Sequence, residues 1–217
     1  MAEYTAYFKG EWMPFSQVKI DPMDRGFTVG DVVFDVARTF NGKSFRMEDH
    51  IQRLYRSLKF VRIDPGLSAK EMLDISEEVV QRNDNLRAEV GDFTITQFVT
   101  RGPGSSSRSA GPPAVCVKVA PIGFGRFADL FKDGAHGVIT RTRSYPVESL
   151  DPKVKNYSRM NFNLADLEAA DVDPEAWPIL TDADGSLTEG TGYNVFLVTD
   201  GVRSEERRVG KECRSRW

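Results

Sequence analysis

Three short segments of the sequence hold residue types that could do chemistry together. The first contains His50, Arg53 and Ser57, the second contains Lys155, and the third contains Glu189. A lysine amine can bond covalently to a carbonyl carbon, an arginine fork binds phosphate oxygens, and a carboxylate can stabilise a protonated ring nitrogen. The three segments therefore point to covalent chemistry on an anionic ligand.

Each segment by itself has an ordinary structural explanation. A lysine in a loop or an arginine on a helix usually faces solvent, and a Thr-Glu-Gly-x-Gly turn is usually a tight connection in which glycine supplies a positive φ. Together, however, they fit pyridoxal 5'-phosphate. That cofactor needs a lysine for its Schiff base, an arginine or a helix N-terminus for its phosphate, and a partner for its ring nitrogen.

Other catalytic signatures are missing from the sequence. It has no G-x-S-x-G, Walker, H-E-x-x-H or C-x-x-C motif. His50 and His136 are far apart, and two cysteines, Cys116 and Cys213, are too few for a disulfide framework or a zinc site. We therefore expect neither a serine hydrolase nor a metal centre.

Composition narrows the class of protein further. The 217 residues include 29 Lys and Arg against 32 Asp and Glu, a net charge of -3, which favours neither nucleic acid nor an anionic membrane as a partner. No apolar run approaches the roughly 20 residues of a membrane helix, and the first 15 residues lack the pattern of a signal peptide. The expected location is the cytoplasm.

The first half of the chain must supply strands and helices that position these groups. Alternation predicts strands over residues 4–8, 12–15, 31–40, 91–100 and 114–120, and Asn41-Gly42 predicts a two-residue hairpin turn. Apolar residues at helical spacing predict helices over 47–63 and 68–81, and Ser68 with Glu71 forms a candidate capping box. The Gly, Ser and Pro residues of 101–113 predict a loop.

The second half predicts a strand over 137–142, a helix over 161–170 and strands over 177–180 and 194–198. Hairpin strands mixed with separate helices favour the α+β class. We expect a small N-terminal domain over 1–121 and a larger cofactor-binding domain that begins at 122, runs to 202 and is incomplete.

Several stretches together resemble the class IV aminotransferase family, the fold type IV pyridoxal-phosphate enzymes. They are FRMEDHIQRLYRS, VTRGPGSSSR, VITRTRS, DPKVKN and LTDADGSLTEGTGYNVFLVTDG. With Asp24-x-Gly26-Phe27 they extend the resemblance over nearly the whole chain from about residue 20 to residue 201. The family includes branched-chain and D-amino-acid aminotransferases and aminodeoxychorismate lyase. The (R)-selective amine transaminases are the branch that this sequence resembles most.

The resemblance implies a role for each matching residue. Lys155 would form the Schiff base and shuttle the proton, Arg53 would bind the cofactor phosphate, and Glu189 would face the pyridine nitrogen. Asn194 would hold the cofactor-binding turn by side-chain to backbone hydrogen bonds.

Two further residues would contact the substrate. Phe34 falls where the amine-transaminase branch places a tyrosine, so an apolar pocket wall and plain core packing both stay open for it. Arg108, which with Arg101 flanks the Gly/Ser loop, matches a mobile arginine that meets a substrate carboxylate.

The resemblance implies transamination between an amino acid or (R)-amine and a keto acid such as pyruvate or 2-oxoglutarate, in a homodimer. An aminodeoxychorismate lyase and a non-catalytic truncated remnant are the alternatives. Residues 203–217 carry a charge of +3 against -6 for the rest, match no family pattern and are expected to be a non-native tail. Because relatives continue with a phosphate-binding helix, we expect this chain to be truncated and impaired.

Overall fold

The computed structural model describes residues 3–203 and divides the chain into two compact units. The first unit runs to Gly123 and also includes Val154–Ser158, and the second contains Phe124–Lys153 and the chain from Arg159 onward. Residues 204–217, and with them almost all of the expected tail, lie outside the described part. The two units are described in turn.

A six-stranded antiparallel sheet forms the first unit. Its order is β2 (Glu11–Pro14), β1 (Thr5–Phe8), β6 (Val115–Pro121), β5 (Phe93–Thr100), β3 (Val32–Phe40) and β4 (Lys43–Ser44). The predicted turn at Asn41-Gly42 is confirmed: both residues have positive φ, 50° and 77°, as a two-residue hairpin of the primed type requires. The turn reverses the chain between β3 and β4.

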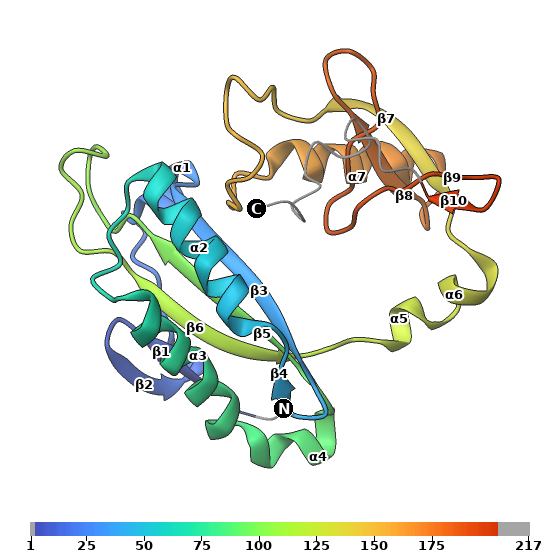
Figure 1. The fold of residues 1–217 in the computed structure, drawn as a ribbon. Coiled ribbons are helices and arrows are strands. Elements are labelled where there is room, and N and C mark those ends of the chain that lie inside the picture. The colour runs from blue at the N-terminus through green and yellow to red at the C-terminus, as the bar shows by residue number, and fades with distance from the viewer. Residues whose placement is uncertain (1–2, 204–217) are drawn as a thin grey trace. The chain divides into compact units, whose positions relative to one another are not determined.

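Two long helices cover one face of this sheet, as Figure 1 shows: α2 (Met47–Val61) and α3 (Ala69–Arg82). The capping box at the start of α3 is confirmed, because Ser68 and Glu71 bond each other's backbone amides. Helix α2 ends at Val61, two residues before its predicted end, because Arg62 has a left-handed φ of 57°. The next residue, Ile63, is buried. Short helices complete the unit, namely η1 (Phe15–Gln17), α1 (Arg25–Val29), η2 (Asp84–Leu86) and α4 (Arg87–Val90).

The two faces of the sheet differ in what they hold. Asp35 lies opposite Gln97 in the register, and Gln97 donates to Ser76 of α3, so both face the helices. Because side chains alternate along a strand, Phe34 and its register partner Phe98 face the other side. Asp35 and Phe34, neighbours in β3, therefore lie on opposite faces of the sheet.

The second unit contains a small βαβ arrangement. Strands β7 (Gly137–Arg143) and β8 (Trp177–Thr181) pair in parallel and are connected through helix α7 (Met160–Val172). Phe162, Ala165 and Leu180 form its buried cluster. The short helices α5 (Gly125–Ala128) and α6 (Leu130–Asp133) precede β7.

The strand predicted over 194–198 is wrong. Only Val198–Thr199 form a strand, β9, which pairs with β10 (Val202–Arg203), and Asn194 makes a single bridge to Glu189. A strand exists only through pairing, and Phe196, Leu197 and Val198 remain about half or more exposed, so the apolar alternation had no sheet to join.

The mixture of an antiparallel sheet, separate helices and one parallel pair confirms the α+β class. Within residues 3–203, none of the helices has the length and apolar character needed to cross a membrane. The same residues contain no group of three or more His, Cys, Asp or Glu side chains that could hold a metal ion.

Candidate active site

The segment around Lys155 lies along the edge of β3. Asn156 forms an antiparallel bridge with Val33, and the amide of Phe34 donates to the Lys155 carbonyl at 3.0 Å. The amide of Tyr157 donates to the Val32 carbonyl at 3.3 Å. The backbone of the candidate catalytic lysine is therefore fixed by the sheet of the first unit, like a short added strand.

The side chain of Lys155 is half-buried and contacts Phe34. Its Nζ lies 4.6 Å from the centroid of the Phe34 ring, a cation–π distance. On the other side of the backbone, the Lys155 amide donates to Oγ of the buried Ser57 at 3.3 Å. Strand β3 and helix α2 thus both hold this lysine.

Tyr157 completes an aromatic wall beside the lysine. Its ring stacks on Phe34 with centroids 4.1 Å apart and approaches Phe98 at 6.4 Å. Burial, and to a lesser extent the nearby Cys116 thiol, raises the pKa of Tyr157 to about 12, so its phenol is neutral near pH 7. The sequence signal was available, because residues i and i+2 of an extended segment share a side and Tyr157 is two residues after Lys155.

Arg53 is held by a buried carboxylate from β3. Its Nε and Nη2 donate to the two oxygens of Asp35, each at 2.7 Å, and the Asp35 side chain has no exposed surface. The Nδ1 atom of His50 lies 2.8 Å from the same carboxylate. Sequence analysis found Arg53 and His50 on α2 but not the aspartate that joins them.

The charges of this cluster stabilise one another. Burial by itself would raise the pKa of Asp35, but hydrogen bonds and charges from Arg53 and His50 leave it below its ordinary value. The bond to Asp35 raises the pKa of Arg53 against the effect of burial. Both groups are therefore ionised at neutral pH, and the residues that the structure describes offer no partner for Nη1 of Arg53.

Arg53 and the lysine segment meet through α2. Ser57, which accepts the Lys155 amide, is four residues after Arg53, so both side chains lie on one helix face about one turn, roughly 5.4 Å, apart. One face of α2 thus carries the guanidinium of Arg53 and, one turn later, Ser57, which binds the backbone amide of Lys155.

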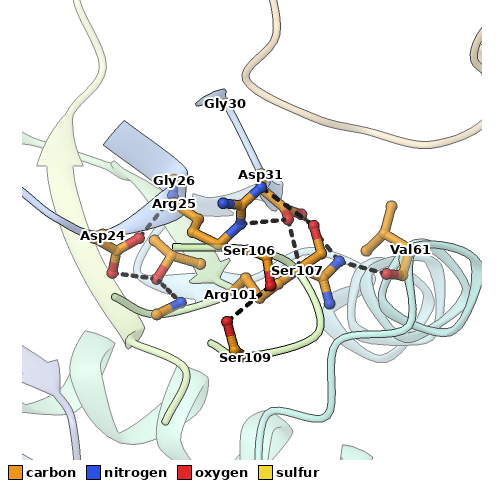
Figure 2. A network of polar contacts seen from close by, with 12 residues as sticks. Asp24, Arg25, Gly26, Gly30, Asp31, Val61, Arg101, Ser106, Ser107 and Ser109 are labelled. Atoms are coloured by element: carbon orange, nitrogen blue, oxygen red, sulfur yellow. Dashed lines mark hydrogen bonds and ion pairs between the residues drawn. The ribbon is translucent and has the colours of Figure 1, made fainter. Parts of the chain in front are cut away.

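The Gly/Ser loop is anchored at its base by Arg101 (Figure 2). Arg101 makes a two-point ion pair with Asp31 and also donates to the carbonyls of Val61 and Arg62 at the end of α2. All three nitrogens of this guanidinium are therefore engaged within the fold. Asp24 adds a second anchor, because it accepts from Gly26 and from Thr100 at 2.7 Å.

Arg108 lies in the exposed part of this loop. The loop runs from Arg101 to β6, and Ser107 accepts a bond from Arg25 at 3.2 Å (Figure 2). The exposed side chain of Arg108 contrasts with the anchored Arg101, although both are arginines of one loop. Of the two, Arg108 is the residue that can reach a solvent-borne anion.

Glu189 and Asn194 belong to the second unit. The Leu180 amide donates to the Glu189 carbonyl at 3.2 Å, which ties the turn to β8, and Asn194 faces Glu189 in an antiparallel bridge. Glu189 is half-buried and Asn194 is exposed. The turn that carries the carboxylate is thus held by backbone pairing.

The glycine of this turn is needed for a different reason than a positive φ. Neither Gly190 nor Gly192 has a positive φ. Instead, the ring of Tyr193 covers Gly190 so closely that an added Cβ would lie 1.9 Å from the ring carbon Cζ. The Tyr193 hydroxyl donates to the carbonyl of Pro178 and its ring packs on Trp177, which closes the turn.

Arg159 is a charged residue of the second unit that sequence analysis missed. It donates to the carbonyl of Thr191, inside the glutamate turn, and stands over the ring of Phe162. Burial lowers the pKa of Arg159, and the charge of Glu189 opposes that shift.

The candidate residues therefore fall into four groups. Phe34 and Lys155 contact each other in the first unit, whereas Arg53 is bound to Asp35 on the helix-covered face of the same strand. Arg108 lies in the exposed loop, and Glu189 and Asn194 share the turn of the second unit. Phe34 contacts both Lys155 and Tyr157 and is buried, so a pocket wall and core packing both stay open for it.

The family model described as "Amino-transferase class IV" matches residues 32–203. A protein of Methanocaldococcus jannaschii with the provisional name branched-chain-amino-acid aminotransferase is 36% identical over 204 residues, 90% of this chain. A D-alanine aminotransferase of Staphylococcus aureus is 26% identical over 198 residues. The chain spans 66% of the length of each of these relatives.

Solved structures share the fold. The branched-chain aminotransferase of Thermoproteus uzoniensis with norvaline superposes with a TM-score of 0.79 at 23% identity, over 93% of this chain and 67% of that one. The T.th. branched-chain amino acid aminotransferase with pyridoxamine 5'-phosphate gives a TM-score of 0.80 at 23% identity, over 94% and 67%. At this identity the likeness concerns the fold.

Proposed function

The chain belongs to the class IV amino-transferase family, and we propose that it acts as a pyridoxal 5'-phosphate-dependent aminotransferase through Lys155. The observation that carries this proposal is the placement of Lys155. Its backbone is fixed by β3 and Ser57, and its Nζ lies against Phe34. One turn earlier on α2, Arg53 keeps one guanidinium nitrogen without a partner in the described residues.

The residues present fit the groups of this cofactor. When bound, it supplies an aldehyde carbon for an amine and a pyridine ring that withdraws electrons from the substrate carbon. Lys155 provides the amine, and its four-carbon stem lets Nζ move while the backbone stays fixed. Nη1 of Arg53 can donate to a phosphate oxygen. The family resemblance assigns the carboxylate of Glu189, which belongs to the second unit, to a protonated ring nitrogen.

Lys155 also carries the proton in this proposal. A base that takes a proton from one carbon and returns it to another must approach both, which a mobile amine beside a fixed wall can do. The ring of Phe34, whose centroid is 4.6 Å from Nζ, shields Nζ from water on one side. The chain thus holds the proton at Nζ and limits its exchange with solvent on that side.

We propose an amino-acid donor and a keto-acid acceptor, such as pyruvate or 2-oxoglutarate. The support is the pair of relatives named for branched-chain amino acids and D-alanine. The apolar surface of Phe34 suits an apolar substrate group, and exposed Arg108 suits a carboxylate. (R)-Amines without a carboxylate are the alternative donors, although Phe34 lacks the tyrosine hydroxyl that the amine-transaminase branch places at this position. From the resemblance we also propose a cytoplasmic homodimer.

Borohydride reduction tests the central claim. The chain is incubated with pyridoxal 5'-phosphate, reduced, digested and mapped by mass spectrometry. We expect the pyridoxyl group on Lys155, its loss in Lys155→Ala and its retention in the matched control Lys153→Ala. No adduct on Lys155 in the wild type would instead support a non-catalytic remnant.

Product analysis then tests the reaction type. An aminotransferase forms a new amino acid only when a keto acid is supplied. Pyruvate and an aromatic amine released from aminodeoxychorismate without any amino acceptor would replace this proposal by a lyase.

A further inference from the structure

Asp35 is a buried carboxylate for which the proposed chemistry has so far assigned no task. It lies on β3 with no exposed surface, next in sequence to Phe34 but on the opposite face of the sheet. A buried carboxylate is costly unless it is paired and hydrogen-bonded. Its partners therefore indicate what it does for the fold and for the site.

Both oxygens of Asp35 are hydrogen-bonded. Oδ2 accepts from Nε of Arg53, and Oδ1 accepts from Nη2 of Arg53 and from the amide of Val36, each at 2.7 Å. Nδ1 of His50 lies 2.8 Å from Oδ1. A carboxylate that meets the Nε–Nη2 edge at two points fixes both the position and the plane of the guanidinium.

This arrangement leaves one nitrogen of Arg53 for a ligand. Nη1 has no partner in the described residues, and the Arg53 side chain keeps 22% of its surface exposed. A free arginine would lose rotamer entropy when it bound an anion, whereas one already clamped at its other edge loses little. Such a nitrogen is a pre-oriented donor for an oxyanion.

We propose that Asp35 is a positioning residue that orients Arg53 so that Nη1 binds the phosphate of a pyridoxal 5'-phosphate-type ligand. The inference rests on the proposed function, which assigns the phosphate to Arg53. In this inference Asp35 strengthens the binding of the phosphate, whereas the negative charge of Asp35 alone would weaken it. A carboxylate 2.7 Å from the guanidinium weakens the attraction of Arg53 for any anion, so charge and orientation predict opposite outcomes when Asp35 is neutralised.

The substitution Asp35→Asn separates the two effects. Asparagine keeps the shape but replaces one acceptor oxygen with a donor NH₂, so the two-point contact with Arg53 is lost. If Asp35 acts by orientation, preference for phosphate falls. If it acts only through its charge, the substitution removes a competing anion and the preference rises.

The measurement compares pyridoxal 5'-phosphate with pyridoxal, which lacks the phosphate, by equilibrium dialysis of the full 217-residue chain. The dissociation constant of pyridoxal divided by that of pyridoxal 5'-phosphate isolates phosphate recognition from everything else. We expect this ratio to fall at least tenfold in Asp35→Asn, with the pyridoxal constant nearly unchanged. An unchanged or increased ratio would overturn the inference.

Asp24→Asn is the matched control. Asp24 is also fully buried in the first unit, and its carboxylate accepts bonds from Gly26 and Thr100 (Figure 2). Neither bond involves Arg53. A merely structural loss would lower the free energy of unfolding in both variants and leave the ratio unchanged in both. We expect the ratio to change only in Asp35→Asn.

The substitution Arg53→Lys tests the role of Asp35 separately from the proposed binding of the phosphate by Arg53. Lysine keeps the charge but cannot be clamped at two points while donating from a third nitrogen. A ratio that falls in Arg53→Lys but stays in Asp35→Asn overturns only the role of Asp35. A wild-type chain without any preference for the phosphate overturns both.

A measurement on the wild type covers the case in which Asp35→Asn does not fold. The two-point contact predicts that rotation about the Nε–Cζ bond of Arg53 is slow and that its Nε–H exchanges slowly with solvent. Both are read from ¹⁵N spectra of the side-chain nitrogens. A rapidly rotating Arg53 guanidinium would contradict the inference.

Discussion

The amine of Lys155 lies over the ring of Phe34, with Nζ 4.6 Å from the ring centroid, and the amide of Phe34 donates to the Lys155 carbonyl. One residue thus holds the lysine at both its backbone and its side chain. The pairing explains why a segment flanked by the second unit is packed into the first.

Removing the Phe34 ring is expected to be costly. Phe34→Ala deletes a side chain that is 8% exposed and stacked on Tyr157, so the free energy of unfolding should fall by about 3 kcal/mol. Urea denaturation measures it. Phe40→Ala, at a ring that is 49% exposed, is the control and should cost about 0.5 kcal/mol. Equal losses would contradict the packing described for Phe34.

Ser57→Ala tests the second support of the lysine. It removes the acceptor of the Lys155 amide, so borohydride labelling at limiting cofactor should fall several-fold while stability falls by about 1 kcal/mol. Ser76→Ala is the control, since Ser76 is a buried helix serine of α3 that does not touch Lys155. Reduced labelling in both variants would show a general loss of structure instead.

Gly190→Ala and Gly192→Ala form a matched pair in one turn. An added Cβ at Gly190 would overlap the Tyr193 ring, whereas at Gly192 it meets no atom within 4 Å. Gly190→Ala should displace the ring and lower stability by about 2 kcal/mol. Trp177 fluorescence during thermal unfolding reports both variants, because Trp177 packs on Tyr193. Similar curves for the two variants would be incompatible with the close ring contact.

The two loop arginines should behave differently when removed. Arg108→Ala should leave stability within about 0.5 kcal/mol, because the side chain is exposed, and should raise KM for the keto acid roughly tenfold. Arg101→Ala leaves Asp31 without its two-point partner and should cost about 3 kcal/mol. An unchanged KM in Arg108→Ala would show that Arg108 does not bind the substrate.

The stability of the first unit should depend on pH through Asp35. Its pKa in the folded chain lies below the ordinary value, so its ionised form stabilises the fold above the unfolded pKa of about 3.9. That contribution is lost as pH falls through the lower folded pKa. The difference in unfolding free energy between wild type and Asp35→Asn should therefore be larger at pH 6 than at pH 3. A difference that is the same at both pH values would contradict the assigned charge state.

Local signals accounted for most elements of the first unit. The turn at Asn41-Gly42, the capping box of Ser68 and the apolar stripe of α2 each depend on residues within a few positions of one another. The strand over 194–198 failed because alternation describes a surface suited to pairing, while pairing itself depends on a distant strand. No short-range pattern contains that information.

The candidate site was predicted residue by residue but not as an arrangement. The motif resemblance located Arg53, Lys155 and Glu189 in the chain. The carboxylate that clamps Arg53 is 18 residues away on another element, and Asp35 looks like any other polar residue in a strand. Likewise, Gly190 is required because the ring of Tyr193 covers it, and not because of a positive φ. That contact exists only in the folded turn.

The assignment of Val154–Ser158 to the first unit has a consequence for the order of biosynthesis. The ribosome releases this segment only after residues 124–153 of the other unit, so the edge of β3 stays uncovered while that stretch emerges. Domains of many proteins fold one after another as they are synthesised. Here the N-terminal half must wait for a later part of the chain, and the residue that completes its sheet edge is the one proposed to do the chemistry.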